Sequence, residues 1–122
     1  MKIEANDLDF TGRRVLVTGA ASGIGAAMAR TFHAHGATMI LADRDVVGLE
    51  KIQQELPASQ GVAFDQADLA SIQALASAAG PVDVLLNNAG VLWSGPFAEM
   101  PMAEMDRVVT VNFLGPMRVA HA

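Results

Sequence analysis

The residues best suited to hold a ligand are three glycines that follow an apolar run at residues 15–18. Glycine lets the backbone approach a ligand where a Cβ would collide, and the Ala-rich segment after them has the composition of a helix, whose first N–H groups have no partner within the helix. Such a strand, turn and helix suit a diphosphate. The alternative is that these glycines serve only tight packing. The candidate contacts are Gly19, Ser22, Gly23, Ile24 and Gly25.

A carboxylate ends the next apolar run, at residues 38–42, and is followed by a cation. Asp43 comes after Gly25 at roughly the 20-residue interval at which dinucleotide folds place an acceptor for the adenosine ribose hydroxyls. An anion there also repels a 2′-phosphate, which favours NAD over NADP. Arg44 has three open roles: contact with a phosphate, stacking beside adenine, or exposure to solvent. The alternative for Asp43 is to be the N-cap of the next helix.

Two further strand ends carry polar or small residues. A short run at residues 61–65 ends in Asp65 and Gln66, and a run at 83–87 continues into Asn87, Asn88, Ala89 and Gly90. Tandem amides at a strand end can bridge neighbouring strand ends, while the small residues after them leave space for a ribose or a diphosphate. The alternative for Asp65 is that it only joins a turn.

Alternating elements position these residues. Strands are expected at residues 14–18, 38–42, 61–65 and 83–87, because their apolar runs are continuous, as in parallel strands covered on both faces. Helices are expected at 23–35, with Ile24 and Met28 on the packed side, at 45–56, and after Asp68 as N-cap. Right-handed crossovers then predict an α/β Rossmann-like parallel sheet of order 3-2-1-4 with helices on both faces. Residues 1–122 are expected to form one incomplete NAD-binding domain.

In this order and spacing, the turn from Thr18 to Gly25, Asp43, Asp65 and the run from Asn87 to Gly90 resemble the short-chain dehydrogenases/reductases, from about Phe10 onward. The resemblance implies an oxidoreductase that moves a hydride between NAD and an alcohol or ketone. It also implies residue roles. Asp65 would bond the adenine amino group, the backbone of Gln66 would lie beside the ring, and Asn87, Ala89 and Gly90 would line the opposite wall. Asn112, expected buried in a helix, matches the family asparagine that kinks this helix and holds a water linked to the catalytic lysine.

The rest of the family's catalytic set is not found in this sequence. The family uses a serine, a tyrosine and a lysine four residues after the tyrosine. The sequence has no tyrosine, and its lysines are Lys2 and Lys51. We therefore expect a truncated cofactor-binding half that does not catalyse hydride transfer alone. The alternatives are a non-catalytic nucleotide-binding module and a structural module for assembly. The strand at 83–87 would be an open edge, which predicts a homo-oligomer or a partner that covers it.

Composition limits the other classes of function. The net charge is −5 and the basic residues are scattered, so nucleic acid is not an expected partner. No apolar run is long enough to cross a bilayer, and a chain without cysteine whose residues 1–7 carry no apolar leader is expected in the cytoplasm. His33 and His35 lie two residues apart on a helix and do not share a face, so no metal site is expected. Ser94 lacks a nucleophile motif and is interpreted as a loop serine.

Overall fold

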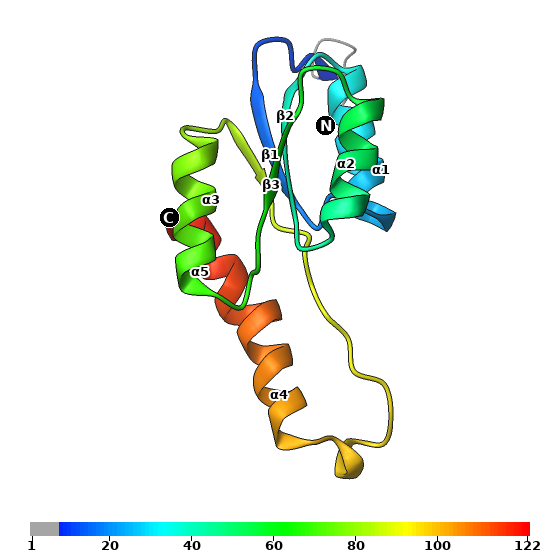
Figure 1. Cartoon of the computed structure of the whole chain (residues 1–122), viewed down its shortest axis with the longest axis vertical. Helices are drawn as coiled ribbons and strands as arrows, with labels where there is room; N and C mark the ends of the chain where they lie inside the picture. The colour runs from blue at the N-terminus through cyan, green and yellow to red at the C-terminus, as the bar shows by residue number, and fades with distance from the viewer. Residues whose placement is uncertain (1–7) are drawn as a thin grey trace, which may run out of the picture.

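A computed structural model describes residues 8–122, and residues 1–7, in which no apolar leader was expected, lie outside the described residues. It confirms the predicted sheet. Four parallel strands stand in the order β3-β2-β1-β4 (Figure 1), and β1 pairs through Val15 with Met39 of β2 on one side and with Val84 of β4 on the other. The sheet therefore has the predicted doubly wound topology. Its strands are β1 (Arg14–Thr18), β2 (Thr38–Asp43), β3 (Gln60–Ala63) and β4 (Val84–Leu86).

Helices cover both faces of the sheet, as predicted (Figure 1). Helices α1 (Gly23–Ala34) and α2 (Val46–Glu55) lie on one face, and α3 (Leu69–Ala79) and α5 (Gly115–His121) lie on the other. Each face of the sheet has its own hydrophobic core, and successive side chains of β1 alternate between them. Val15 and Val17 pack on the first face and Leu16 packs on the second. Burial on both faces explains why these strands read as continuous apolar runs.

The chain after β4 leaves the sheet. It runs through a long loop to the short helix η2 (Phe97–Glu99) and then to α4 (Met102–Val109), which projects away from the sheet (Figure 1). None of the α4 residues is buried. Helix α5 returns to the sheet, where Val119 joins the core beneath α3.

Helices α4 and α5 are joined by one wide turn, the π-helix η3 (Thr110–Leu114). Pro116 has no N–H and its ring excludes the carbonyl four residues earlier, so an ordinary α-helix cannot continue through it. The N–H of Gly115 instead donates to the Thr110 carbonyl, five residues back. Asn112 lies within this widened turn. It is exposed, which corrects the expectation of a buried asparagine, because its side chain points to a loop rather than into the core.

The starts of the helices confirm one expectation and overturn two others. Asp68 caps α3 as predicted, with its carboxylate accepting from Ala70 N. Asp45, not Asp43, caps α2 by accepting from Gly48 N, so the alternative role of Asp43 as N-cap is wrong. Ile24 is 73% exposed rather than packed, because the close approach of α1 to the sheet buries only small side chains, Ala26 and Ala29 among them.

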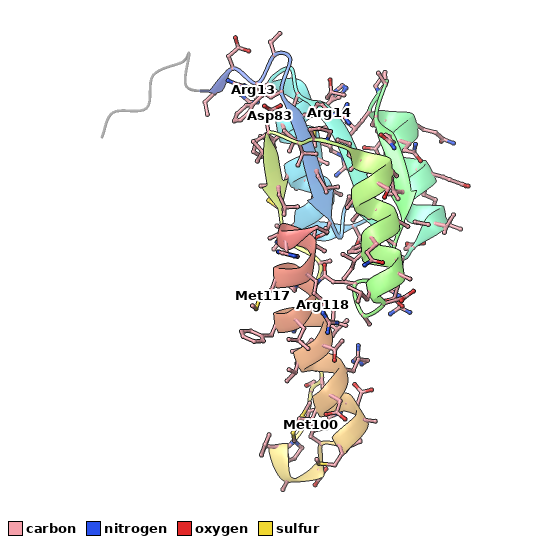
Figure 2. The ribbon with its side chains drawn as sticks, turned by 90° about the vertical axis from the view of Figure 1, so that its left-hand side faces the viewer. Arg13, Arg14, Asp83, Met100, Met117 and Arg118 are labelled. Carbon is pink, nitrogen blue, oxygen red and sulfur yellow. The ribbon has the colours of Figure 1, made fainter. Side chains whose placement is uncertain are left out.

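The amino end of the sheet is closed by a charged cluster opposite the strand ends that hold the candidate ligand residues (Figure 2). Asp83 accepts hydrogen bonds from Arg14 N at 2.8 Å and from Arg13 Nη1 at 3.2 Å. The backbone N–H of Arg14, and to a lesser extent the Arg13 guanidinium, lower the pKa of Asp83 below its usual value. Arg14 also donates to the carbonyls of Pro81 and Ala79, where α3 ends.

Across residues 8–122, no helix combines the length and the apolar character needed to span a membrane.

Candidate functional site

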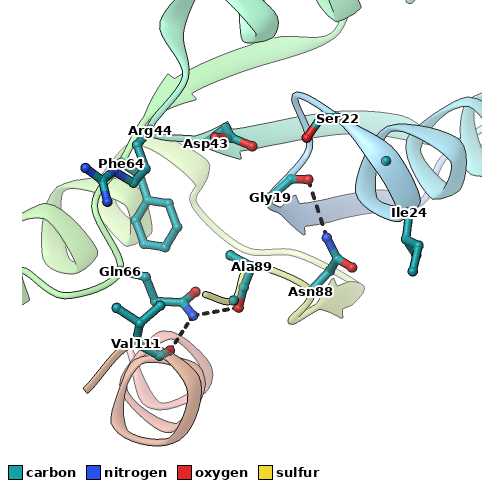
Figure 3. A pocket seen from close by; sticks show the side chains of 12 residues that line it. Gly19, Ser22, Ile24, Asp43, Arg44, Phe64, Gln66, Asn88, Ala89 and Val111 are labelled. Atoms are coloured by element: carbon teal, nitrogen blue, oxygen red, sulfur yellow. Dashed lines mark hydrogen bonds between the residues drawn. The ribbon is translucent and has the colours of Figure 1, made fainter. Parts of the chain in front are cut away.

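A cavity of about 380 Å³ opens at the carboxyl end of the sheet (Figure 3). Here the neighbouring strands β1 and β4 send their connections to opposite faces of the sheet, β1 to α1 and β4 toward α5. This is the switch point at which open α/β sheets bind ligands. Nine residues predicted as cofactor contacts lie in its wall. The lining consists of Gly19, Ser22, Gly23, Ile24, Asp43, Arg44, Phe64, Gln66, Asn88, Ala89, Gly90 and Val111.

The glycines of the turn after β1 have two different roles: some leave space for a ligand, and some allow close packing. Gly23 has φ +53° and open space where a Cβ would stand, so it keeps the cavity accessible. Gly19 has φ +67°, and a Cβ there would lie 2.9 Å from Asn88 Nδ2. Gly25 is not in the cavity wall, and a Cβ there would collide with the Gly19 carbonyl. The packing interpretation therefore applies to Gly25, and both interpretations apply to Gly19.

The amino end of α1, where the helix dipole is positive, faces the cavity. Ser22 precedes the helix in an extended conformation, its side chain makes no capping bond, and the first turn contains no acidic residue. The first N–H groups of α1 therefore have no partner within the helix and no neighbouring carboxylate in that turn. Together with the helix dipole, they favour an anion beside Gly23 and Ile24.

Asp43 is fixed at the end of β2 by two backbone donors. One carboxylate oxygen accepts from Ala21 N at 2.9 Å, which ties it to the glycine turn, and the other accepts from Asp45 N at 2.9 Å. Each oxygen retains a free lone pair, so the half-buried carboxylate can still accept from hydroxyl groups. Arg44 lies at the rim with its side chain exposed.

A hydrogen-bond network joins the glycine turn to the end of β4. The buried Thr18 hydroxyl oxygen accepts from the backbone N–H groups of Asn88 and Ala89, each at 3.0 Å. The Asn88 side chain donates back to the carbonyls of Thr18, at 3.1 Å, and Gly19, at 3.4 Å (Figure 3). A bridge between strand ends was expected of the tandem amides, and Asn88 provides it.

Asn87 and Asn88 differ in position because adjacent residues of an extended chain point to opposite sides. Asn87 lies outside the cavity wall and donates through Nδ2 to Pro116 O at 3.1 Å. Asn88 lies in the wall but was absent from the predicted contacts. Continuing the alternation of β4, in which Val84 and Leu86 pack against one core and Leu85 against the other, would have separated the two amides.

The β3–α3 connection contributes differently from what the resemblance implied. Asp65 lies outside the cavity wall, and its carboxylate accepts from Ala67 N at 2.9 Å, so it does form a turn. Its neighbours Phe64 and Gln66 are buried and line the cavity. Phe64 and Val111 were not predicted as lining residues, since only the tertiary packing of distant segments places them there.

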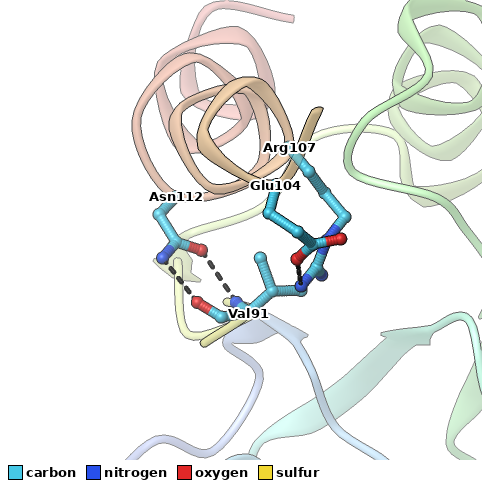
Figure 4. Close-up of polar contacts among 4 residues, drawn as sticks. All are labelled: Val91, Glu104, Arg107 and Asn112. Atoms are coloured by element: carbon cyan, nitrogen blue, oxygen red, sulfur yellow. Dashed lines mark hydrogen bonds and ion pairs between the residues drawn. The ribbon is translucent and has the colours of Figure 1, made fainter. Parts of the chain in front are cut away.

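Asn112 holds the loop that follows β4 (Figure 4). Its Oδ1 accepts from Val91 N at 2.8 Å and its Nδ2 donates to Val91 O at 2.7 Å, so one side-chain amide satisfies both backbone polar groups of Val91. In the preceding helix α4, Glu104 pairs with Arg107 at 2.6 Å and raises the pKa of that guanidinium.

Within residues 8–122, no three His, Asp or Glu side chains are grouped so as to hold a metal ion. His33 and His35 contact separate backbone carbonyls, those of Pro57 and Thr31.

Comparison with known proteins shows which family the chain belongs to. The sequence model described as short chain dehydrogenase matches residues 13–122. The chain belongs to this family. Among curated short-chain dehydrogenase relatives, L-xylulose reductase of Bos taurus is 36% identical over 114 residues, which are 93% of this chain and 47% of that protein. D-Threitol dehydrogenase of Mycolicibacterium smegmatis is 38% identical over 126 residues, covering 95% of this chain and 48% of the relative. The chain thus spans about half the length of the curated relatives that it matches.

Solved short-chain dehydrogenase structures share the fold closely. The 3-ketoacyl-(acyl-carrier-protein) reductase of Brucella melitensis, complexed with NADH, superposes with a TM-score of 0.88 at 35% identity, over 93% of this chain and 49% of that one. A short-chain dehydrogenase/reductase of Burkholderia phymatum in complex with NAD gives a TM-score of 0.88 at 34% identity, over 93% and 43% of the two chains.

Proposed function

We propose that this chain binds the adenosine and diphosphate parts of NAD in the cavity at the carboxyl end of the sheet. The observation that carries the proposal is the pairing of two features in one wall: the fixed Asp43 carboxylate and the open amino end of α1. The carboxylate would accept from the adenosine ribose hydroxyls, and the α1 N–H groups would receive the diphosphate. The NADH and NAD complexes of the two related structures support a nicotinamide dinucleotide as the ligand.

The choice of NAD over NADP follows from charge. A 2′-phosphate would stand beside the Asp43 carboxylate, whose position is fixed by two backbone N–H groups and cannot move away without losing them. Arg44 at the rim is the cation available to offset that repulsion, and its exposure weakens the offset. We expect a preference for NAD.

Several assignments that the family resemblance implies belong to this proposal. Asp65 would bond the adenine amino group after its carboxylate turns away from Ala67 N. Asn87, which does not line the present cavity, would contact the cofactor beside it. Gly25 would act through the shape of the turn rather than by contact, since its neighbour is the Gly19 carbonyl. Asn112 would position the loop at Val91 beside the reacting end of the cofactor.

We further propose that the whole protein is an NAD-dependent oxidoreductase acting on an alcohol or ketone. The family membership and the reductase and dehydrogenase relatives support that class. Because this chain matches only about half of those relatives, the nicotinamide and substrate contacts would come from outside it. The exposed outer edge of β4 is the surface on which further sheet structure, from the same protein or from a second copy, would pair.

Calorimetric titration of the chain with NAD, NADP and ADP-ribose tests the nucleotide proposal. ADP-ribose is expected to bind about as tightly as NAD, because the nicotinamide contacts are proposed to lie outside this chain. Asp43→Ala should weaken NAD by about 10-fold to 100-fold, the value of a hydrogen bond to a charged group, and reduce the discrimination against NADP. Asp106→Ala removes an equal charge from the exposed helix α4 and serves as control. If neither NAD nor ADP-ribose binds the wild-type chain, the cavity belongs to a structural module instead.

A further inference from the structure

Gln66 is one of two buried polar side chains among residues 8–122, and it joins three separate segments. From the β3–α3 connection, its Nε2 donates to the carbonyl of Ala89 at 3.0 Å and to the carbonyl of Val111 at 2.7 Å (Figure 3). Ala89 belongs to the cavity wall after β4, and Val111 belongs to the π-helix η3. One amide group therefore uses both of its donors to connect the cavity wall to the α4–α5 segment.

The Val111 carbonyl needs a donor from outside its own helix. In the wide turn, the residue five positions on is Pro116, which has no N–H, and the N–H of Gly115 already donates to Thr110 O. Gln66 supplies the missing donor. Its side chain fits there because residue 115 is glycine, since a Cβ at that position would collide with Gln66 Cγ.

Both backbone polar groups of Ala89 are held by side chains. Its N–H donates to the Thr18 hydroxyl and its carbonyl accepts from Gln66, so the wall of the cavity is fixed between the glycine turn and the π-helix. The orientation of the Gln66 amide is equally determined. Its Oε1 is buried with no partner among the described residues, yet a reversed amide would set that oxygen against two carbonyl oxygens. The two hydrogen bonds donated by Nε2 therefore determine the orientation of the Gln66 side-chain amide.

We infer that Gln66 is a positioning residue of the proposed nucleotide site, where its amide fixes Ala89 in the cavity wall and couples that wall to the π-helix. The inference rests on the proposed function for the identity of the ligand. It gives a specific role to the Gln66 side chain, which acts through Ala89 and does not itself need to touch the nucleotide.

The variant Gln66→Glu tests this role through pH. The introduced carboxylate, when ionised, has no donor and would place a negative charge against both carbonyls, whereas the protonated carboxyl group can donate to one of them. ADP-ribose should therefore bind Gln66→Glu about 10-fold more weakly than wild type at pH 8, and recover much of that loss near pH 5. Gln54→Glu makes the same change on the exposed side of α2 and should follow the wild-type pH profile.

The variant Gln66→Met keeps the length of the side chain but has no hydrogen-bond donor. It provides a second test if the charged variant Gln66→Glu does not fold. We expect it to fold, to bind ADP-ribose about 10-fold more weakly than wild type, and to show no recovery at low pH. Wild-type affinity in Gln66→Met, or a Gln66→Glu profile that matches Gln54→Glu, would overturn the inference.

Amide hydrogen exchange without ligand separates this inference from the proposed function. In Gln66→Met, the backbone around Ala89 and across Thr110–Leu114 should exchange faster than in wild type, while α2 should be unchanged. Unchanged exchange in both segments would count against the coupling whether or not nucleotide binds. A wild-type chain that binds no nucleotide, with faster exchange in the variant, would refute the proposed function and leave the coupling intact.

Discussion

Strands β2 and β4 both pair with β1, but they differ in burial. In β2, Met39, Ile40 and Leu41 are almost completely buried, whereas all three residues of β4 are only half-buried. The reason is position, because β2 lies between two strands while β4 is at the edge with α4 directed away from it (Figure 1). Figure 2 shows the same edge from the side.

This difference separates two sides of the candidate site. On the side toward β2, backbone N–H groups fix the Asp43 carboxylate and tie it to the glycine turn. The wall after β4 has less core behind it and is held mainly by side-chain amides: Asn88, Gln66 and Asn112. The side toward β2 is thus backed by a fully packed core, whereas the wall after β4 depends mainly on side-chain hydrogen bonds.

The strongest test of this contrast is a pair of core truncations. Leu41→Ala in β2 should lower the free energy of unfolding by about 3 kcal/mol, because it leaves a cavity in a fully packed core. Leu85→Ala in β4 should cost about half as much, since Leu85 is half-buried. Urea unfolding of both variants measures the difference. Equal losses would mean that β4 is covered in solution, by a second copy or by another partner.

A second test concerns the link between the two sides. Thr18→Val keeps the shape of the side chain but removes the acceptor of two backbone N–H groups, those of Asn88 and Ala89. The loss should be about 2 kcal/mol of unfolding free energy, as for partly buried donors left unpaired. Thr31→Val, where the hydroxyl only bonds Ala27 O on an exposed helix, is the matched control and should change stability much less. Thermal unfolding of both proteins compares them.

A smaller effect is expected in the wall after β4. Asn112→Leu removes both bonds to Val91 at an exposed site, where water can replace them, so the cost should be about 1 kcal/mol or less. The effect on local amide exchange should be larger than the effect on the free energy of unfolding. The Val91 amide should exchange faster, and the amides of β2 should not change. Exchange that rises equally at Val91 and in β2 would show that the two sides of the cavity do not open separately.

The smallest effect lies at the amino end of the sheet, where Asp83 joins β1 to the start of β4. Its pKa is lowered in the folded chain, so its contribution to stability is present above the unfolded pKa of about 4 and is lost as the pH falls through the lowered value. Asp83→Asn should therefore flatten the acid side of the stability profile. Unfolding midpoints between pH 7 and pH 3 measure this, with Asp106→Asn as a control for charge.

The sequence allowed the main elements and the sheet order to be predicted, because the strand runs and the glycines act locally. Asp43 and the glycine turn were found in the same way, from spacing along one strand-turn-helix unit. Phe64, Asn88 and Val111 were not predicted as lining residues, since their places depend on how distant segments pack. The exposure of Ile24 and Asn112 went against prediction for the same reason: helical spacing shows which residues share a face, but not which face is covered.

The strand order also has a consequence for how the chain is made. Val15 pairs with Met39 early in the sequence, yet its partner on the other side, Val84, must be synthesised much later. Closing the longer loop costs more chain entropy, so a β1-β2-β3 nucleus is expected to form first and β4 to dock onto it last. On the ribosome, the side of the cavity that carries Asp43 and the glycine turn would then form before the opposite wall.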